Sequence, residues 1–125
     1  MEIKYQQILT VVGNASLTFD MNYYVYVIEL DKSVGKIIKF RKQNPSFILG
    51  ERCFYVGQTA KKPIQRLQEH KRGYKSNSYA KKYGIRLRPE FYDKYNPIPT
   101  RKDAEDLESH LTIQLRKKGY GVWSN

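Results

Sequence analysis

The chain contains one cysteine and no long apolar run. A single Cys53 cannot form an intramolecular disulfide or build a cysteine-rich zinc site. The longest apolar run, residues 23–28, is far too short to cross a bilayer, and the N-terminal residues 1–4 lack the charged-then-apolar order of a signal peptide. These absences favour a cytoplasmic protein with no membrane partner, in which Cys53 beside Phe54 is a buried hydrophobic residue.

Several catalytic and recognition motifs are also missing. The sequence contains no glycine-rich phosphate loop, no nucleophile elbow and no cluster of histidines and cysteines, so a small-molecule enzyme has little support. It contains no helix-turn-helix or zinc finger that would recognise duplex DNA. Neither an internal repeat nor a low-complexity segment is visible, and no obligate protein partner is evident.

Acidic residues are scarce, and the excess of basic residues is concentrated in one segment. The chain carries 23 Lys and Arg against 12 Asp and Glu, a formal net charge of +11, which favours a polyanionic partner: nucleic acid first, a membrane surface second. Residues 61–88 contain ten Lys or Arg and one acid, Glu69. Tyrosines at positions 74, 79, 83 and 92 lie within or beside this segment, where they serve either base stacking or core packing. The residues we expect to bind nucleic acid are Lys61, Lys62, Lys71, Arg72, Tyr74, Lys75, Tyr79, Lys81 and Lys82.

A chain of 125 residues fits one compact domain. Residues 1–22 carry a modest strand signal followed by a Gly13-Asn14 turn, which predicts an N-terminal strand or hairpin extension. The domain proper then covers residues 23–125. It begins with the strongest strand of the chain, residues 23–30, and a partner strand is predicted at residues 54–56. Between them lies a long excursion with a possible short strand at residues 36–41.

The second half of the chain predicts helices and one more strand. Pro63 and Gly73 delimit a short helix, on which Ile64, Leu67 and the stem of Lys71 form the inner face. A helical piece at residues 77–83 and a strand at residues 85–92 follow. Thr100, with an acid three residues later, caps the longest helix, which Gly119 ends. The expected fold is an α/β (α+β) domain with a small, mainly antiparallel, three-stranded sheet flanked by helices.

Residues suited to phosphodiester hydrolysis follow one another in order along these elements. Tyr26 and Tyr55 lie in the two strands, and Arg66 and His70, four residues apart, share a stripe of the short helix from which both can reach one ligand. Glu108 falls at the edge of the buried face of the long helix.

Each of these residue types suits one part of the reaction. A carboxylate with phosphate oxygens and water is a normal Mg²⁺ environment, and the arginine fork suits non-bridging phosphate oxygens. Tyr26, Tyr55 and His70 are alternatives for the group that deprotonates water.

Each residue also has an ordinary structural interpretation. The tyrosines can pack across strands, His70 can lie on a helix surface, and Arg66 can be a solvated charge. Glu105 and Glu108 can pair with Arg101 or Lys102 one turn away.

In combination, the residues resemble the GIY-YIG nuclease family, in particular its small stand-alone bacterial members. The resemblance covers about the last hundred residues, through Tyr24-Val25-Tyr26, Tyr55-Val56-Gly57, Arg66 with His70, the helix motif Ala104-x-x-x-Glu108-x-x-Leu111, and Asn125. The sequence departs from the family pattern in having Tyr24 in place of glycine, more residues between the triplets, and Arg66 about one position late. The resemblance implies the catalytic residues Tyr26, Tyr55, Arg66, His70, Glu108 and Asn125, with Glu108 as the metal ligand.

The implied function is a divalent-metal-dependent endonuclease that uses Mg²⁺ or Mn²⁺ and cleaves DNA. The interleaved tyrosines and cations favour single-stranded or unpaired DNA. The alternative is a catalytically inactive DNA- or RNA-binding module that uses the same basic segment.

Overall fold

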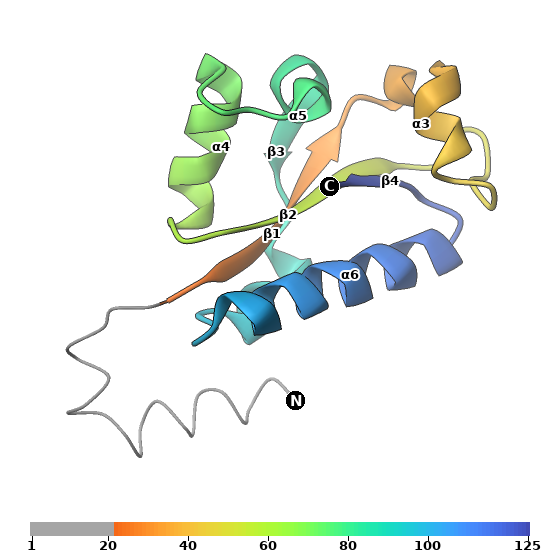
Figure 1. Cartoon of the computed structure of the whole chain (residues 1–125). Helices are drawn as coiled ribbons and strands as arrows, with labels where there is room; N and C mark the ends of the chain where they lie inside the picture. Colours follow the sequence, from red (N-terminus) through yellow and green to blue (C-terminus); the bar gives the residue numbers. More distant parts are fainter. Residues whose placement is uncertain (1–21) are drawn as a thin grey trace, which may run out of the picture.

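The computed structural model describes residues 22–125, and Figure 1 shows their arrangement. The predicted N-terminal extension, residues 1–22, lies outside this range except for Asn22. Four strands form one sheet: β1 (Tyr24–Leu30), β2 (Cys53–Thr59), β3 (Gly84–Leu87) and β4 (Gly121–Ser124), in the order β3-β1-β2-β4. Helices cover both faces of this sheet, which confirms the expected α+β class of sheet flanked by helices.

The prediction of three mainly antiparallel strands is wrong in its details. β1 pairs antiparallel with β2 and with β3, but β4 is a fourth strand and runs parallel to β2. The sheet is therefore mixed. A parallel neighbour requires a connection that crosses from one end of the sheet to the other, and helix α6 (Arg101–Lys117) is the last part of that connection.

The helices divide between the two faces. Helix α6 lies on one face, and α3 (Ile38–Lys42), α4 (Pro63–Arg72) and α5 (Ser78–Tyr83) lie on the other (Figure 1). Because both faces are covered, β1 and β2 are buried along most of their length instead of alternating between core and solvent. Short 3-10 helices complete the fold: η1 (Lys32–Lys36), η2 (Pro89–Phe91) and η3 (Asp93–Tyr95).

The ends of the main helices follow their local sequence signals. Pro63 occupies the first turn of α4, and Gly73, with φ of 86°, adopts the left-handed conformation that ends it. The Asn77 side chain accepts hydrogen bonds from the first backbone N–H groups of α5. The Thr100 hydroxyl accepts from the backbone N–H of Asp103 at 3.1 Å at the start of α6. The three helices therefore begin and end close to the positions predicted from sequence.

Two strand predictions and one helix face are wrong. Residues 36–41 form the end of η1 and the start of α3, with Phe40 buried in the core. The strand predicted at residues 85–92 ends at Leu87, since Pro89 cannot continue the ladder of backbone hydrogen bonds. On α4 the buried side chain is His70, whereas Ile64 is 55% exposed.

The segment between β1 and β2, which we call the insertion (residues 31–52), is fastened to the edge of the sheet. The Asn44 side chain accepts from the backbone N–H of Val122 at 2.7 Å and from Arg116 Nε at 3.0 Å, and it donates to the Phe40 carbonyl at 2.8 Å. Arg116 Nη2 also donates to the carbonyl of Val122 at 2.9 Å. The insertion therefore holds β4 in place through its outer edge.

Within residues 22–125, no helix has both the length and the apolar character needed to cross a membrane. Cys53 is buried, as predicted.

Candidate active site

A cleft of about 350 Å³ opens where β2 extends beyond the end of β4, between α4 and α6. Its lining residues are Tyr26, Tyr55, Gly57, Gln58, Arg66, Glu105, Glu108, Ser109 and Asn125. Five of the six predicted catalytic residues therefore line one cavity, although they come from β1, β2, α4, α6 and the C-terminal end of the chain. His70 is the exception.

The pairing of β1 with β2 places the two tyrosines. Tyr26 lies opposite Gly57 in the antiparallel register, and a Cβ atom at position 57 would lie 2.6 Å from Tyr26 Oη. Glycine at position 57 is therefore required by the tyrosine ring that passes over it. The Tyr26 and Tyr55 ring centroids are 6.1 Å apart, and both side chains are almost fully buried, so these residues belong to the core and to the wall of the cleft at once.

His70 lies behind this wall and is fully buried. Its Nε2 is 2.9 Å from Tyr26 Oη, and its Nδ1 accepts from the backbone N–H of Asn77 at 3.1 Å. Burial and the neighbouring Arg66 charge lower the pKa of His70 to about 4, so the ring is neutral at pH 7. Because Nδ1 accepts, the neutral ring carries its proton on Nε2 and donates it to Tyr26. His70 and Arg66 therefore do not reach one ligand together, contrary to the prediction from their spacing.

The Tyr55 hydroxyl is held by Asn125, which Asn77 in turn orients. Asn125 Nδ2 donates to Tyr55 Oη at 3.0 Å, and Asn125 Oδ1 accepts from Asn77 Nδ2 at 3.3 Å. The second bond fixes the orientation of the Asn125 side-chain amide. Burial, and then the neighbouring Tyr55, raise the pKa of Tyr26, whose oxygen already accepts from His70. Burial raises the pKa of Tyr55, whereas Tyr26, Arg66 and Asn125 oppose that rise.

Arg66 is held in a fixed position between the cleft and the loop after α4. Its Nη1 donates to Glu69 at 3.1 Å and to the Tyr74 carbonyl at 3.2 Å, and its Nη2 donates to the Lys75 carbonyl at 2.7 Å. These three contacts leave two of the five guanidinium N–H groups without a partner among residues 22–125. Lys61 also pairs with Glu69 and so shares the carboxylate with Arg66. Arg66 thus supports the Tyr74–Lys75 backbone and retains free donors.

Glu108 is the one half-buried carboxylate of the cleft with no hydrogen bond or ion pair to any residue among 22–125. Burial, and then the charge of Glu105 one turn away, raise its pKa to about 7. Glu105 itself is exposed and pairs with Arg101 at 3.3 Å, and Lys102 pairs with Asp106. The helix therefore pairs its exposed acids and leaves Glu108 uncompensated.

A divalent cation fits this arrangement because it would neutralise a carboxylate that no side chain neutralises. No group of three or more His, Cys, Asp or Glu side chains in residues 22–125 is placed to hold a metal. A cation here would therefore depend on Glu108, with Glu105 next to it, and on oxygens from the substrate and water.

The predicted nucleic-acid-binding residues fall into two groups. Lys62, Lys71, Arg72, Tyr74, Lys75, Lys81 and Lys82 are exposed, and Lys61 is half-buried. Tyr79 is only 8% exposed and packs against Trp123, with ring centroids 4.5 Å apart, so it belongs to the core and does not present its ring to a base. Tyr92 is buried as well.

Three site residues were not predicted. Gln58 and Ser109 line the cleft directly beside Gly57 and Glu108, but a single Gln or Ser in a strand or helix gives no signal of its own. Asn77 connects His70, Asn125 and the start of α5. Its position before a helical segment indicates a helix cap and does not reveal the other two contacts.

No protein-family model matches the chain, and comparisons with curated proteins and with solved structures find no match.

Proposed function

We propose that this protein is a divalent-metal-dependent endonuclease that hydrolyses DNA phosphodiester bonds, as the resemblance to the GIY-YIG nucleases implies. The observation that carries the proposal is the meeting of two buried tyrosines, a fixed arginine and an uncompensated carboxylate in one cleft. Phosphodiester hydrolysis requires a base for water, a cation for the charge of the transition state and stabilisation of the leaving oxygen. A cytoplasmic location is part of the same proposal.

Glu108 would hold Mg²⁺ or Mn²⁺ in this enzyme. The bound ion supplies Lewis-acid stabilisation of the phosphate and of the leaving oxygen. The raised pKa of Glu108, about 7, means that protons and metal compete for the same oxygen atoms near neutral pH.

Hydrogen-bond directions favour Tyr55 over Tyr26 and His70 as the general base. The His70 Nε2 proton is committed to Tyr26, and burial and the neighbouring Tyr55 raise the pKa of Tyr26, so its hydroxyl keeps its own proton. Burial raises the pKa of Tyr55 as well, but Tyr26, Arg66 and the hydrogen bond from Asn125 oppose that rise, so the Tyr55 phenolate is the better stabilised of the two. Tyr55, as the phenolate that remains when its own proton is released to solvent, would take the proton from water, while His70 orients the Tyr26 hydroxyl from behind.

Arg66 would contact a non-bridging phosphate oxygen through its two free N–H groups. Its other three donors are fixed by Glu69 and by the two loop carbonyls, so the guanidinium need not reorganise as charge develops. A donor that is already ordered contributes more to the transition state than a mobile surface arginine.

The preference for single-stranded or unpaired DNA is supported by Tyr74 beside the cleft. Its ring is 52% exposed, and Lys61 Nζ and Lys75 Nζ lie 5.3 and 5.6 Å from its centroid. An exposed aromatic ring between two cations suits a stacked base with neighbouring phosphates.

A catalytically inactive DNA- or RNA-binding module is the second candidate, because among residues 22–125 a metal would have only Glu108 and Glu105 as carboxylates in the cleft. Incubation of the full chain with matched single- and double-stranded DNA and RNA, in Mg²⁺ or in EDTA, separates the two. We expect cleavage of single-stranded DNA in Mg²⁺, none in EDTA, and none by a Glu108→Gln variant that still binds. Binding without cleavage in Mg²⁺ and in Mn²⁺ would leave the binding module.

A further inference from the structure

The positive charge of the chain is distributed unequally between the two faces of the sheet. Helix α6 carries four cations and four acids, so its formal charge is zero. On the opposite face, residues 32–42 carry five cations and no acid, and residues 63–83 carry six cations and one acid. The excess charge of these elements therefore lies on the face covered by α3, α4 and α5, and nearly half of its cations belong to the insertion.

The cations of the insertion have no ionic partners among residues 22–125. The side chains of Lys32, Lys36, Lys39, Arg41 and Lys42 are exposed, and none makes an ion pair or a side-chain hydrogen bond with any residue among 22–125. On α6, by contrast, Arg101 and Lys102 each pair with an acid one turn away. Five uncompensated cations in eleven residues repel one another, and a polyanion would relieve that repulsion.

The insertion is anchored to the folded body, so the backbone that carries its charges holds a defined position. Three hydrogen bonds of 2.7–3.0 Å link Asn44, Arg116 and Val122 of β4, and Asn44 also donates to the Phe40 carbonyl within the insertion. Phe40 projects from α3 into the core, where its ring lies 5.7 Å from that of Tyr79. A surface fixed in this way binds a ligand with little loss of conformational entropy.

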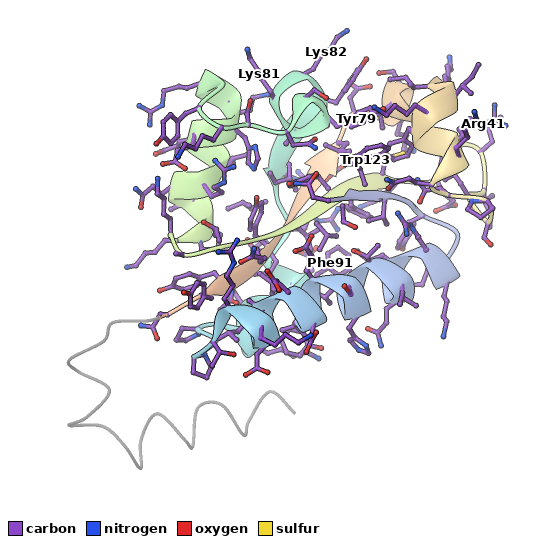
Figure 2. All side chains as sticks on the ribbon, in the orientation of Figure 1. Arg41, Tyr79, Lys81, Lys82, Phe91 and Trp123 are labelled. Atoms are coloured by element: carbon purple, nitrogen blue, oxygen red, sulfur yellow. The ribbon has the colours of Figure 1, made fainter. Side chains whose placement is uncertain are left out.

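The C-terminal end of β4 connects the cleft with the insertion. Asn125 lines the cleft, and Trp123, two residues earlier on the same side of the strand, is half-buried between Tyr79 and Phe40. Lys39 Nζ lies 5.8 Å from the Trp123 ring centroid. Figure 2 shows Trp123 and Tyr79 between Arg41 of α3 on one side and Lys81 and Lys82 of α5 on the other.

We propose that the exposed cations of residues 32–42 form a second nucleic-acid-binding surface, which contacts the phosphates of the substrate strand beyond Asn125 and Trp123. This inference rests on the proposed function, because it takes the cleft as the place where the same strand is cut. The surface contacts backbone phosphates and reads no sequence. Its consequence is a binding site longer than the cleft.

The test compares two oligonucleotide lengths in the full chain, in EDTA so that nothing is cut. The probes are single-stranded oligothymidylates of about 6 and about 30 nucleotides, the shorter able to fill the cleft alone. The variant Lys39→Ala/Arg41→Ala removes two of the free cations. For each phosphate that the variant no longer neutralises, we expect its affinity for the longer probe to fall roughly 5-fold at about 0.1 M salt. The slope of log affinity against log salt concentration should fall by about 0.7 per phosphate lost. Affinity for the shorter probe should not change.

The control is Lys117→Ala/Lys118→Ala, which removes the same charge from exposed positions at the end of α6. We expect it to behave as the wild type with both probes. An equal loss in both variants, or an unchanged affinity of the insertion variant for the longer probe, would overturn the inference. Binding to phosphatidylserine vesicles that depends on Lys39 and Arg41, without such dependence for DNA, would overturn it in favour of a membrane surface.

Trp123 provides an independent reading, since it is the one tryptophan of the chain. We expect its fluorescence to change with the longer probe and not with the shorter one.

The outcomes also separate this inference from the proposed function. A protein that binds both probes as expected but never cuts in Mg²⁺ refutes only the nuclease. One that cuts, but whose insertion variant binds normally, refutes only the second surface.

Discussion

Replacing Glu108 by glutamine should stabilise the protein at alkaline pH while it abolishes cleavage. The pKa of Glu108 is about 7 in the fold against an ordinary 4.5, so the folded protein holds this proton more tightly than the unfolded chain does. The contribution of Glu108 to the free energy of unfolding therefore falls as pH rises from 4.5 towards 7, and the loss is complete above 7. A shift of this size corresponds to about 3 kcal/mol. Because water in the cleft screens part of the charge, we expect roughly 1–3 kcal/mol.

Thermal unfolding at pH 4.5 and pH 8.5 provides the measurement. For a domain of this size, each kcal/mol shifts Tm by about 4 °C, so Glu108→Gln should raise Tm by roughly 4–12 °C at pH 8.5 relative to its effect at pH 4.5. Comparing the two pH values cancels the effect of the amide itself. Mg²⁺ at about 100 times its Kd should stabilise the wild type by about 2.7 kcal/mol at pH 8.5 and leave the variant unchanged.

Glu105→Gln is the matched control for this experiment. Glu105 is exposed and paired with Arg101, and its charge is the lesser cause of the raised Glu108 pKa, so Glu105→Gln should raise Tm at pH 8.5 by much less than Glu108→Gln does. Two results would refute the reasoning: a Glu108→Gln protein with no pH-dependent gain in Tm, or Mg²⁺ stabilising the wild type and the variant equally. The first would show that the carboxylate is well solvated, and the second that metal binds elsewhere.

The remaining predictions concern the other site residues. Tyr55→Phe should lower the single-turnover rate by roughly 10²-fold or more, and Tyr26→Phe by less, since only the first removes the base; a larger loss for Tyr26→Phe would contradict this order. The pKa of His70 is about 4 in the fold and 6.5 ordinarily, so its contribution to the free energy of unfolding, opposite in sign to that of Glu108, should fall by up to about 3 kcal/mol as pH drops from 6.5 to 4. Urea titrations should show that His70→Gln weakens this dependence, and an identical one would disprove it. Arg66→Lys keeps the charge but loses the forked contacts to the loop. The cleavage rate should fall roughly 10²-fold, and residues 74–76 should become sensitive to limited proteolysis. A variant that cuts normally and resists proteolysis would show that Arg66 contributes only its positive charge.

Local signals in the sequence predicted the helices better than the sheet. Pro63, Gly73 and Thr100 act within a few residues of where they stand, so the ends of α4 and α6 could be inferred without knowledge of the rest of the molecule. The strand β4 has four residues, and its partner β2 lies more than sixty positions earlier, so nothing local marks it. The same limit explains the strand wrongly expected at residues 36–41, where burial of Phe40 outweighs the β-branched Ile37 and Ile38.

The identity of the site residues could be predicted from the sequence better than the contacts between them. The two tyrosines and Glu108 were identified from their order and from the edge position on a helix, and the structure brings them to one cleft. Helical spacing placed Arg66 and His70 on one stripe but could not show which side of a largely polar helix faces the sheet. The helix turns His70 towards the sheet and buries it behind Tyr26. Spacing alone had suggested that His70 and Arg66 bind the same ligand.

The attachment of Asn44 and Arg116 to Val122 also bears on self-association. An exposed edge strand offers unpaired N–H and C=O groups to which a strand of another molecule can add. At β4, both backbone groups of Val122 are already bonded to side chains of the same chain. A second copy could extend the sheet at this edge only after breaking those bonds, so the insertion protects the molecule against edge-to-edge aggregation.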